Sequence, residues 1–144
     1  MKIKGNTIVN ASSDKIWNLL NDSEVLARIT PGVTKLERIE GDKFNAISEV
    51  KIGPVKGKFE GLMELMDKVD EKGMKVVLDQ KSKIGNAIAT ITMEMKPTAD
   101  GKTEIHYSGE AKMSGMLARM GQRIMGGVIT TLSRQFFEAL EKEV

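Results

Sequence analysis

The chain contains no cysteine and only one histidine, His106, among its 144 residues. Without cysteine there are no disulfides and no thiol chemistry, which is compatible with a reducing compartment. Zinc and redox-metal sites take several ligands from histidine and cysteine, and Asp67, Asp70 and Glu71 lack the spacing of a calcium loop. A catalytic nucleophile needs a converging base, yet strand alternation turns His106 outward. We therefore expect no metal, no cofactor, no catalytic residue and no enzymatic activity.

Aromatic residues are also scarce, with four Phe, one Trp and one Tyr. The 22 basic and 20 acidic residues are interspersed along the chain and leave a formal net charge of +2. Nucleic-acid binding needs a basic patch, which for single strands is combined with aromatic side chains for stacking. The composition therefore gives no support for a nucleic-acid partner.

Long apolar runs are absent, and no segment approaches the roughly 18 apolar residues that span a bilayer. The first ten residues, MKIKGNTIVN, lack the uninterrupted apolar core of a signal peptide. We therefore expect a soluble, cytoplasmic protein. A chain of 144 residues fits a single domain over residues 1–144, long enough to bury about two thirds of the surface that its unfolded form exposes.

What the sequence does contain is a long alternation of apolar and charged residues between positions 43 and 113. Alternation with a period of two indicates antiparallel strands with one solvated face. The other face is almost free of charge and must be covered. Breaks of hairpin length separate the strands at residues 40–42, 53–56, 70–73, 85–86 and 97–101.

Helices are predicted on both sides of this strand region. After a first strand over residues 2–9, Ser12 or Ser13 can cap a short helix, and a second short helix follows over residues 23–29. Pro31 and the glycine after it end the second helix. A final helix of about 29 residues starts at Gly115 and would be about 43 Å long, enough to cross the whole sheet.

The final helix carries two apolar stripes, rotated by about 100° from each other. The change falls at Gly126 and Gly127, which indicates a bend, a close backbone approach or room left for something else. The stripes consist of Met116, Leu117, Met120 and Ile124, and then of Val128, Ile129, Leu132, Phe136 and Leu140. We predict an α+β fold in which this helix packs across a curved, antiparallel seven-stranded sheet over a hydrophobic cavity.

The order of these elements resembles the START-like (SRPBCC) helix-grip architecture. Within it, the sequence resembles the CoxG family of carbon monoxide dehydrogenase, most specifically in the stretch Gly53-Pro54-Val55-Lys56-Gly57-Lys58-Phe59-Glu60-Gly61. Further matches are Ile16-Trp17, Leu20-Asn21-Asp22, Pro31-Gly32, Tyr107-Ser108-Gly109-Glu110, Gly115-Met116-Leu117-Ala118, Gly121-Gln122-Arg123 and Phe136-Phe137.

The resemblance implies a domain with a hydrophobic cavity for a quinone or another lipid-like ligand. It also implies a role in the assembly or membrane recruitment of a molybdenum hydroxylase such as carbon monoxide dehydrogenase. Many members of the family continue into a linker and an apolar membrane anchor. This sequence ends at Val144 without one, so peripheral membrane contact is the form that we expect.

Candidate cavity residues come from the inward positions of the strands and of the final helix. Many of them are among the ten methionines, which suit a pliable pocket wall but equally suit ordinary core packing. Gln80, Ser82 and Tyr107 are inward polar groups that either orient a ligand or bond to the backbone in a filled core. The predicted lining is Phe59, Met63, Leu78, Gln80, Ile91, Met93, Ile105, Tyr107, Met113, Met116, Met120 and Ile124.

Gly53, Gly57 and Gly61 do not form a phosphate-binding loop, because no helix follows them and no Gly-Lys-Ser/Thr is present. We interpret them as a tight turn with glycines in the flanking strands, where a bulge lets the sheet bend.

Two hypotheses of different classes remain open. The first is a non-enzymatic domain that binds a hydrophobic small molecule between the sheet and the last helix. The second is a protein-interaction or assembly factor whose interior is filled. It would act on a component of a molybdenum hydroxylase through the Pro31-Gly32 loop, the hairpin 51–58 and the side chains of Arg119 and Arg123.

Overall fold

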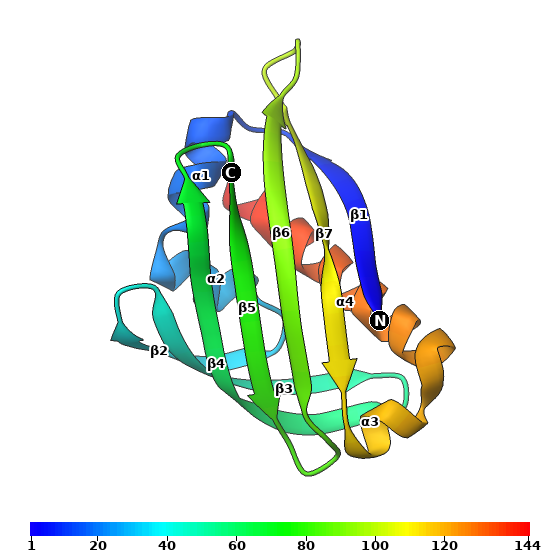
Figure 1. Cartoon of the computed structure of the whole chain (residues 1–144). Helices are drawn as coiled ribbons and strands as arrows, with labels where there is room; N and C mark the ends of the chain where they lie inside the picture. Colours follow the sequence, from blue (N-terminus) through cyan, green and yellow to red (C-terminus); the bar gives the residue numbers. More distant parts are fainter.

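A seven-stranded antiparallel sheet forms one wall of the molecule (Figure 1). The computed structural model describes all residues from 1 to 144. The strands lie in the order β1-β7-β6-β5-β4-β3-β2, so that β1 closes the sheet beside the last strand. Their bounds are β1 Lys2–Val9, β2 Val33–Glu40, β3 Lys43–Ile52, β4 Val55–Val69, β5 Gly73–Lys81, β6 Ala87–Pro97 and β7 Thr103–Met113. The predicted α+β fold with a seven-stranded antiparallel sheet is confirmed.

Two short helices connect β1 to β2, as predicted. They are α1 (Ser13–Leu20) and α2 (Ser23–Ile29). Ser12 occupies the N-cap position of α1, but its side chain makes no capping hydrogen bond. The carboxylate of Asp22 caps α2 by accepting hydrogen bonds from the backbone N–H groups of Glu24 and Val25, at 2.9 and 3.4 Å.

The predicted continuous helix at the end of the chain is in fact two helices, α3 (Gly115–Arg119) and α4 (Gly121–Glu143). They meet at Gly121, whose φ of +84° lies outside the helical region and is accessible chiefly to glycine. The prediction of a bend at Gly126 and Gly127 is therefore wrong, since both residues lie inside α4. The rotation between the two apolar stripes reflects the change of direction from one helix to the next.

The sheet is strongly curved where β3 and β4 sweep across its lower end (Figure 1). The predicted bulge at the glycines is absent, because β3 and β4 pair without interruption through Gly57 and Gly61. A methyl group on Gly61 would instead clash with the backbone carbonyl of Asp79 on β5. The register shift of β4 lies between Met66 and Val69, where Asp67 has a φ of +50°.

The helices cover one face of the sheet and divide the core into separate clusters. The largest cluster joins Ile16 of α1, Leu26 of α2 and Leu140 of α4 to inward side chains of the strands. A second cluster, around Val55 and Leu117, lies near α3. The core is therefore closed at both ends of the sheet. None of the helices combines the length and the apolar content needed to cross a bilayer.

An ion pair fastens α2 to the last turn of α4. The guanidinium Nη2 of Arg28 lies 2.8 Å from Oε1 of Glu143, and the Arg28 Nε donates to Oε2 at 3.1 Å. This bidentate arrangement holds the C-terminal end of α4 over the first two helices. It lies at the end of the molecule opposite α3.

Candidate ligand cavity between the sheet and the last helix

An apolar cavity of about 290 Å³ lies between the inward face of the sheet and α4. Side chains from all seven strands, from α1 to α4 and from the turn at Thr30 and Pro31 contribute to its wall. Of the 32 lining residues, 27 are hydrophobic, so the cavity suits an apolar ligand with few polar groups. We call this space the ligand cavity.

The exposure of inward side chains on β5 traces the ligand cavity independently. Met74 is buried, whereas Val76, Leu78 and Gln80 on the same inward face are only half-buried. Strand β5 lies in the middle of the sheet, so neighbouring strands cover it on both sides. The remaining exposed surface of these inward side chains therefore faces the cavity.

Small residues on the neighbouring strand leave room beside this row. In the register of β5 and β6, Leu78 lies opposite Ala89 and Gln80 opposite Ala87. Ala111 on β7 lies opposite Ala89 in turn. Three alanines thus replace larger side chains on the floor of the cavity, which keeps this part of the interior unfilled.

Tyr107 on β7 forms part of the wall together with two rings of α4. Its ring stacks on Phe137 with centroids 5.1 Å apart, and Phe137 meets Phe136 edge to face at the same distance. The Tyr107 ring extends over Gly5, its direct partner on β1. A methyl group on Gly5 would clash with the Tyr107 hydroxyl oxygen, so the glycine creates the space for the phenol.

The inward polar groups behave differently from one another. Ser82 bonds only to the backbone, donating to the Gly85 carbonyl at 2.5 Å and accepting from the Ile84 N–H at 3.2 Å. Gln80 donates through Nε2 to the Leu62 carbonyl at 3.0 Å. Its oxygen Oε1 is buried and has no hydrogen-bond partner.

The structure places eight of the twelve predicted lining residues around the ligand cavity. Ile105 does not line it, because this side chain is completely buried in the cluster beneath the first helices. Met120 packs against the second cluster instead. Met116 and Ile124 are 47 % and 43 % exposed, because the break at Gly121 turns their positions away from the sheet. The eight are Phe59, Met63, Leu78, Gln80, Ile91, Met93, Tyr107 and Met113.

The wall that the helices contribute is missing from the predicted lining. The second apolar stripe of the last helix is recognisable in the sequence, and four of its five residues line the cavity. The loop after α2, predicted only as a surface feature, also contributes. The missed lining residues include Leu20, Leu26, Thr30, Pro31, Val33, Met125, Val128, Ile129, Leu132, Ser133, Phe136 and Phe137.

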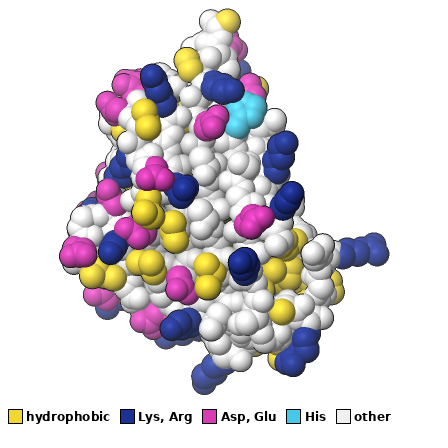
Figure 2. Space-filling model, in the orientation of Figure 1, with side chains coloured by type: hydrophobic (Ala, Val, Ile, Leu, Met, Phe, Trp, Pro, Cys, Tyr) yellow, Lys and Arg dark blue, Asp and Glu magenta, His cyan; other side chains and the backbone are white.

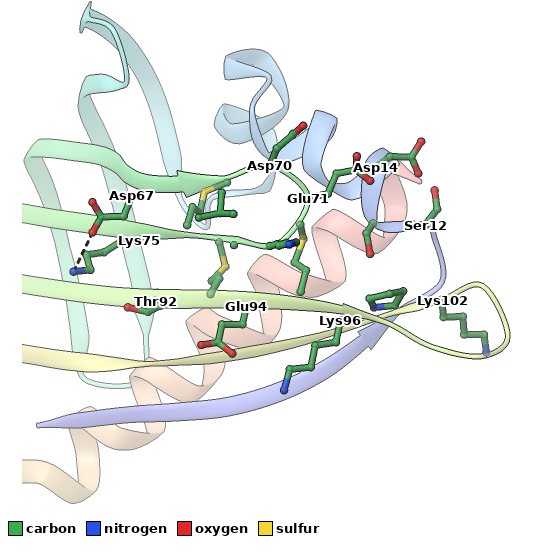
Figure 3. A pocket seen from close by; sticks show the side chains of 18 of the residues that line it. Ser12, Asp14, Asp67, Asp70, Glu71, Lys75, Thr92, Glu94, Lys96 and Lys102 are labelled. Carbon is green, nitrogen blue, oxygen red and sulfur yellow. Dashed lines mark ion pairs between the residues drawn. The ribbon is translucent and has the colours of Figure 1, made fainter.

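A second depression, of about 1120 Å³, lies at the end of the sheet near α1 and is polar (Figure 3). Only 4 of its 19 lining residues are hydrophobic, and acidic and basic side chains alternate around it. Asp67 and Lys75 form an ion pair there at 3.3 Å. A hydrogen bond from the Ser12 hydroxyl lowers the pKa of Asp14 at its rim. No three His, Cys, Asp or Glu side chains are grouped to hold a metal ion.

His106 lies on the outward face of β7, as its position in the alternation predicts. Its Nε2 lies 2.5 Å from Oε1 of Glu104, and both side chains are well exposed. The imidazole is thus on the other side of the sheet from the ligand cavity, which brings no acid and base pair together.

Three segments without any acidic residue meet at the end of the molecule where α3 lies. They are residues 50–59, 80–93 and 111–137. The Leu117 N–H donates to the Ile84 carbonyl at 3.1 Å, and both residues pack with Val55 in the second cluster. Eight exposed cations, none in an ion pair, extend from them: Lys51, Lys56, Lys58, Lys81, Lys83, Lys112, Arg119 and Arg123. We call this surface the basic end.

The basic end also exposes Met116 and Ile124. Figure 2 shows this combination at its lower right, where basic and hydrophobic side chains gather without acidic ones. Along the sequence the two signs of charge alternate, so that their separation arises only when the fold joins the three segments.

Solved structures of other proteins share this fold. A conserved protein from Geobacillus kaustophilus is 28% identical over 99% of this chain and 94% of its own, with a TM-score of 0.96. A START superfamily protein from Mycobacterium smegmatis is 11% identical over 99% and 96%, with a TM-score of 0.75. The Zhui aromatase/cyclase from Streptomyces sp. R1128 is 14% identical over 99% and 92%, with a TM-score of 0.66. No curated protein matches the chain.

The sheet, the helix across it and the cavity between them define a START-like helix-grip domain, a class that often binds hydrophobic ligands and is generally not catalytic. The model of the CoxG family of carbon monoxide dehydrogenase matches residues 5–144. The chain belongs to the CoxG family.

Proposed function

We propose that this protein binds a hydrophobic small molecule, lipid-like or quinone-like, in the ligand cavity and carries it without chemical change. The observation that supports the proposal is the apolar cavity of about 290 Å³ between the sheet and α4. Burial of apolar ligand surface would supply the binding free energy, at about 25 cal/mol per Å². The family supports a role of this carrier in serving a carbon monoxide dehydrogenase-type molybdenum hydroxylase, in its assembly or its recruitment to a membrane.

The first experiment extracts the purified protein with organic solvent and identifies co-purifying lipids or quinones by mass spectrometry. A stoichiometric apolar compound supports the carrier. An empty extract, together with no thermal stabilisation by added quinones and lipids, contradicts it.

A pair of variants on one strand then locates the site. Ile91 lines the cavity, whereas Ile88 on the same strand faces outward and is 49 % exposed. Ile91→Asn should abolish ligand uptake, and Ile88→Asn should leave it unchanged. If a folded Ile91→Asn protein binds as the wild type does, the ligand lies elsewhere.

The basic end favours a second candidate function, in which the protein docks on an acidic surface of a molybdenum hydroxylase. It is supported by eight exposed cations without a neighbouring acid and by exposed Met116 and Ile124 at their centre. Complementary charges accelerate and orient such association, and apolar side chains at the centre add affinity.

Binding of a purified molybdenum hydroxylase tests the second candidate. Lys56→Glu at the basic end should weaken binding and its dependence on salt, whereas Lys96→Glu at the opposite end should not. Equal binding by both variants contradicts the docking surface. If the protein binds vesicles containing anionic phospholipid in place of the enzyme, with the same dependence on Lys56, the partner is a membrane surface instead.

A further inference from the structure

The unpartnered oxygen of Gln80 indicates the chemical class of the ligand. More than nine tenths of buried polar groups in proteins have a hydrogen-bond partner, so an orphaned oxygen in the wall of a cavity requires an explanation. Gln80 Oε1 is the only buried side-chain nitrogen or oxygen in this chain without a partner. Gln80 also lines the ligand cavity.

The orientation of the amide is fixed by its other half. The Leu62 carbonyl oxygen, 3.0 Å away, can only accept a hydrogen bond, so the group that faces it must be the amide Nε2. The unpartnered atom is therefore the oxygen, an acceptor. A flip of the amide would place two carbonyl oxygens against each other.

The neighbours of Gln80 leave the amide uncovered. In the registers of the sheet it lies between Gly61 on β4 and Ala87 on β6. Neither residue offers a hydrogen-bond donor in its side chain. The last side-chain torsion of glutamine is broad, so a modest rotation turns the oxygen toward a group in the cavity.

Water is a poor partner at this place. A buried water needs two to four polar neighbours, and the apolar wall supplies few of them. The other polar side chains of the lining are Thr30, Ser48, Ser133 and the hydroxyl of Tyr107, on other elements. The donor must then come with the ligand.

We propose that Gln80 Oε1 accepts a hydrogen bond from the ligand, which is an apolar molecule bearing a hydroxyl or N–H donor. This rests on the proposed carrier function and narrows it. Quinones, esters and ethers offer only acceptors, whereas alcohols, phenols and the reduced quinol form of a quinone offer hydroxyl donors. A quinone-like ligand would therefore be held in its reduced state.

Calorimetric titration of the full chain with 1-naphthol and 1-methoxynaphthalene tests the proposal, because the two compounds differ only in the hydroxyl donor and its methyl ether. The wild type should bind 1-naphthol about tenfold more tightly, since leaving a buried acceptor unpaired costs about this factor. Gln80→Met should reduce the preference to about onefold, whereas Lys81→Met, next in sequence on the outward face, should retain it.

The outcomes distinguish the carrier function from the role of Gln80. If neither compound binds, the carrier function itself is contradicted for small aromatic ligands. If both bind the wild type equally, the cavity is a binding site but Gln80 does not select a donor, which includes the case of a trapped water. If Gln80→Met retains the preference, the ligand hydroxyl bonds to another group and the assignment of Gln80 is overturned.

Discussion

Tyr107 and Gly5 lie directly opposite each other on β7 and β1, and the phenol occupies the space that a side chain on Gly5 would take. Gly5→Ala should therefore destabilise the protein by about 1–3 kcal/mol, as overpacking usually does. Urea denaturation measures the change.

A double variant provides the control for this prediction. Tyr107→Leu removes the ring that the new methyl group meets, so Gly5→Ala should cost much less in that background. Additive costs of the two substitutions would show that Gly5 is needed for its backbone and not for the fit of Tyr107.

At the same scale, the alternation of residues is a good guide to side chains in strands and a poor one in the last helices. Met63 and Ile91 line the cavity because a period of two fixes which face of a sheet a side chain occupies. The prediction for Met116 and Ile124 assumes one continuous helix, and the assumption fails at a single backbone angle. The unpartnered oxygen of Gln80 could not be predicted, because it depends on which carbonyl the amide reaches.

At the scale of elements, the glycines of α4 make opposite contributions to stability. Gly121 has a φ of +84°, whereas Gly127 is helical and nothing lies within 4 Å of the position of an added methyl group. Gly121→Ala should destabilise the protein by about 1–2 kcal/mol, and Gly127→Ala should stabilise it by about 0.5–1 kcal/mol. Thermal unfolding compares the two. The reverse order of stabilities would move the break between helices back to Gly127.

The ion pair between α2 and α4 makes stability depend on pH. The hydrogen bond from Arg28 lowers the pKa of Glu143 below its usual value of 4.5. The stabilisation is then complete above pH 4.5 and is lost as the pH falls through the lowered pKa, where the folded protein takes up a proton. Glu143→Gln should be less stable than the wild type at neutral pH, and the two should converge in acid.

Denaturation series at several pH values measure this effect. Glu138→Gln is the control, because Glu138 pairs with Arg134 at 3.7 Å on the surface of α4 alone and no other element depends on it. A Glu143→Gln protein whose stability relative to the wild type does not change with pH would contradict the assigned role of the pair.

The arrangement of elements could be predicted largely from the sequence, and the details of their bending could not. Hairpin-length breaks and the period of two give the order of the strands, since each strand pairs with its neighbour. The glycines near Phe59 indicate curvature, but the register shows that β4 bends there without a bulge. Curvature depends on contacts between strands, such as the close approach of Gly61 to Asp79, which strand patterns do not fix.

At the scale of the whole molecule, the core is filled at its end and hollow in its middle. Leu140 is fully buried at the closed end, whereas Leu78 borders the ligand cavity. Leu140→Ala should cost about 2–5 kcal/mol, because it removes contacts and opens a new void. Leu78→Ala should cost only about 1–2 kcal/mol, since the void already exists and mainly the transfer of the lost methyl groups counts.

Urea denaturation with an unchanged m-value measures both costs. The comparison also separates the carrier from an assembly factor with a filled interior. Equal costs for the two leucines would show that the middle of the core is as closely packed as its end.

The separation of charge at the basic end has a consequence for the molecule as a body in an electric field. Eight of the 22 basic residues lie there, so the other 14 share the rest of the molecule with all 20 acidic residues, a balance of −6 against +8. A nearly neutral protein thus has a large electric dipole along its long axis. It would rotate before contact and arrive at any negatively charged body with α3 leading, an orientation that salt abolishes once the Debye length falls to a few ångströms.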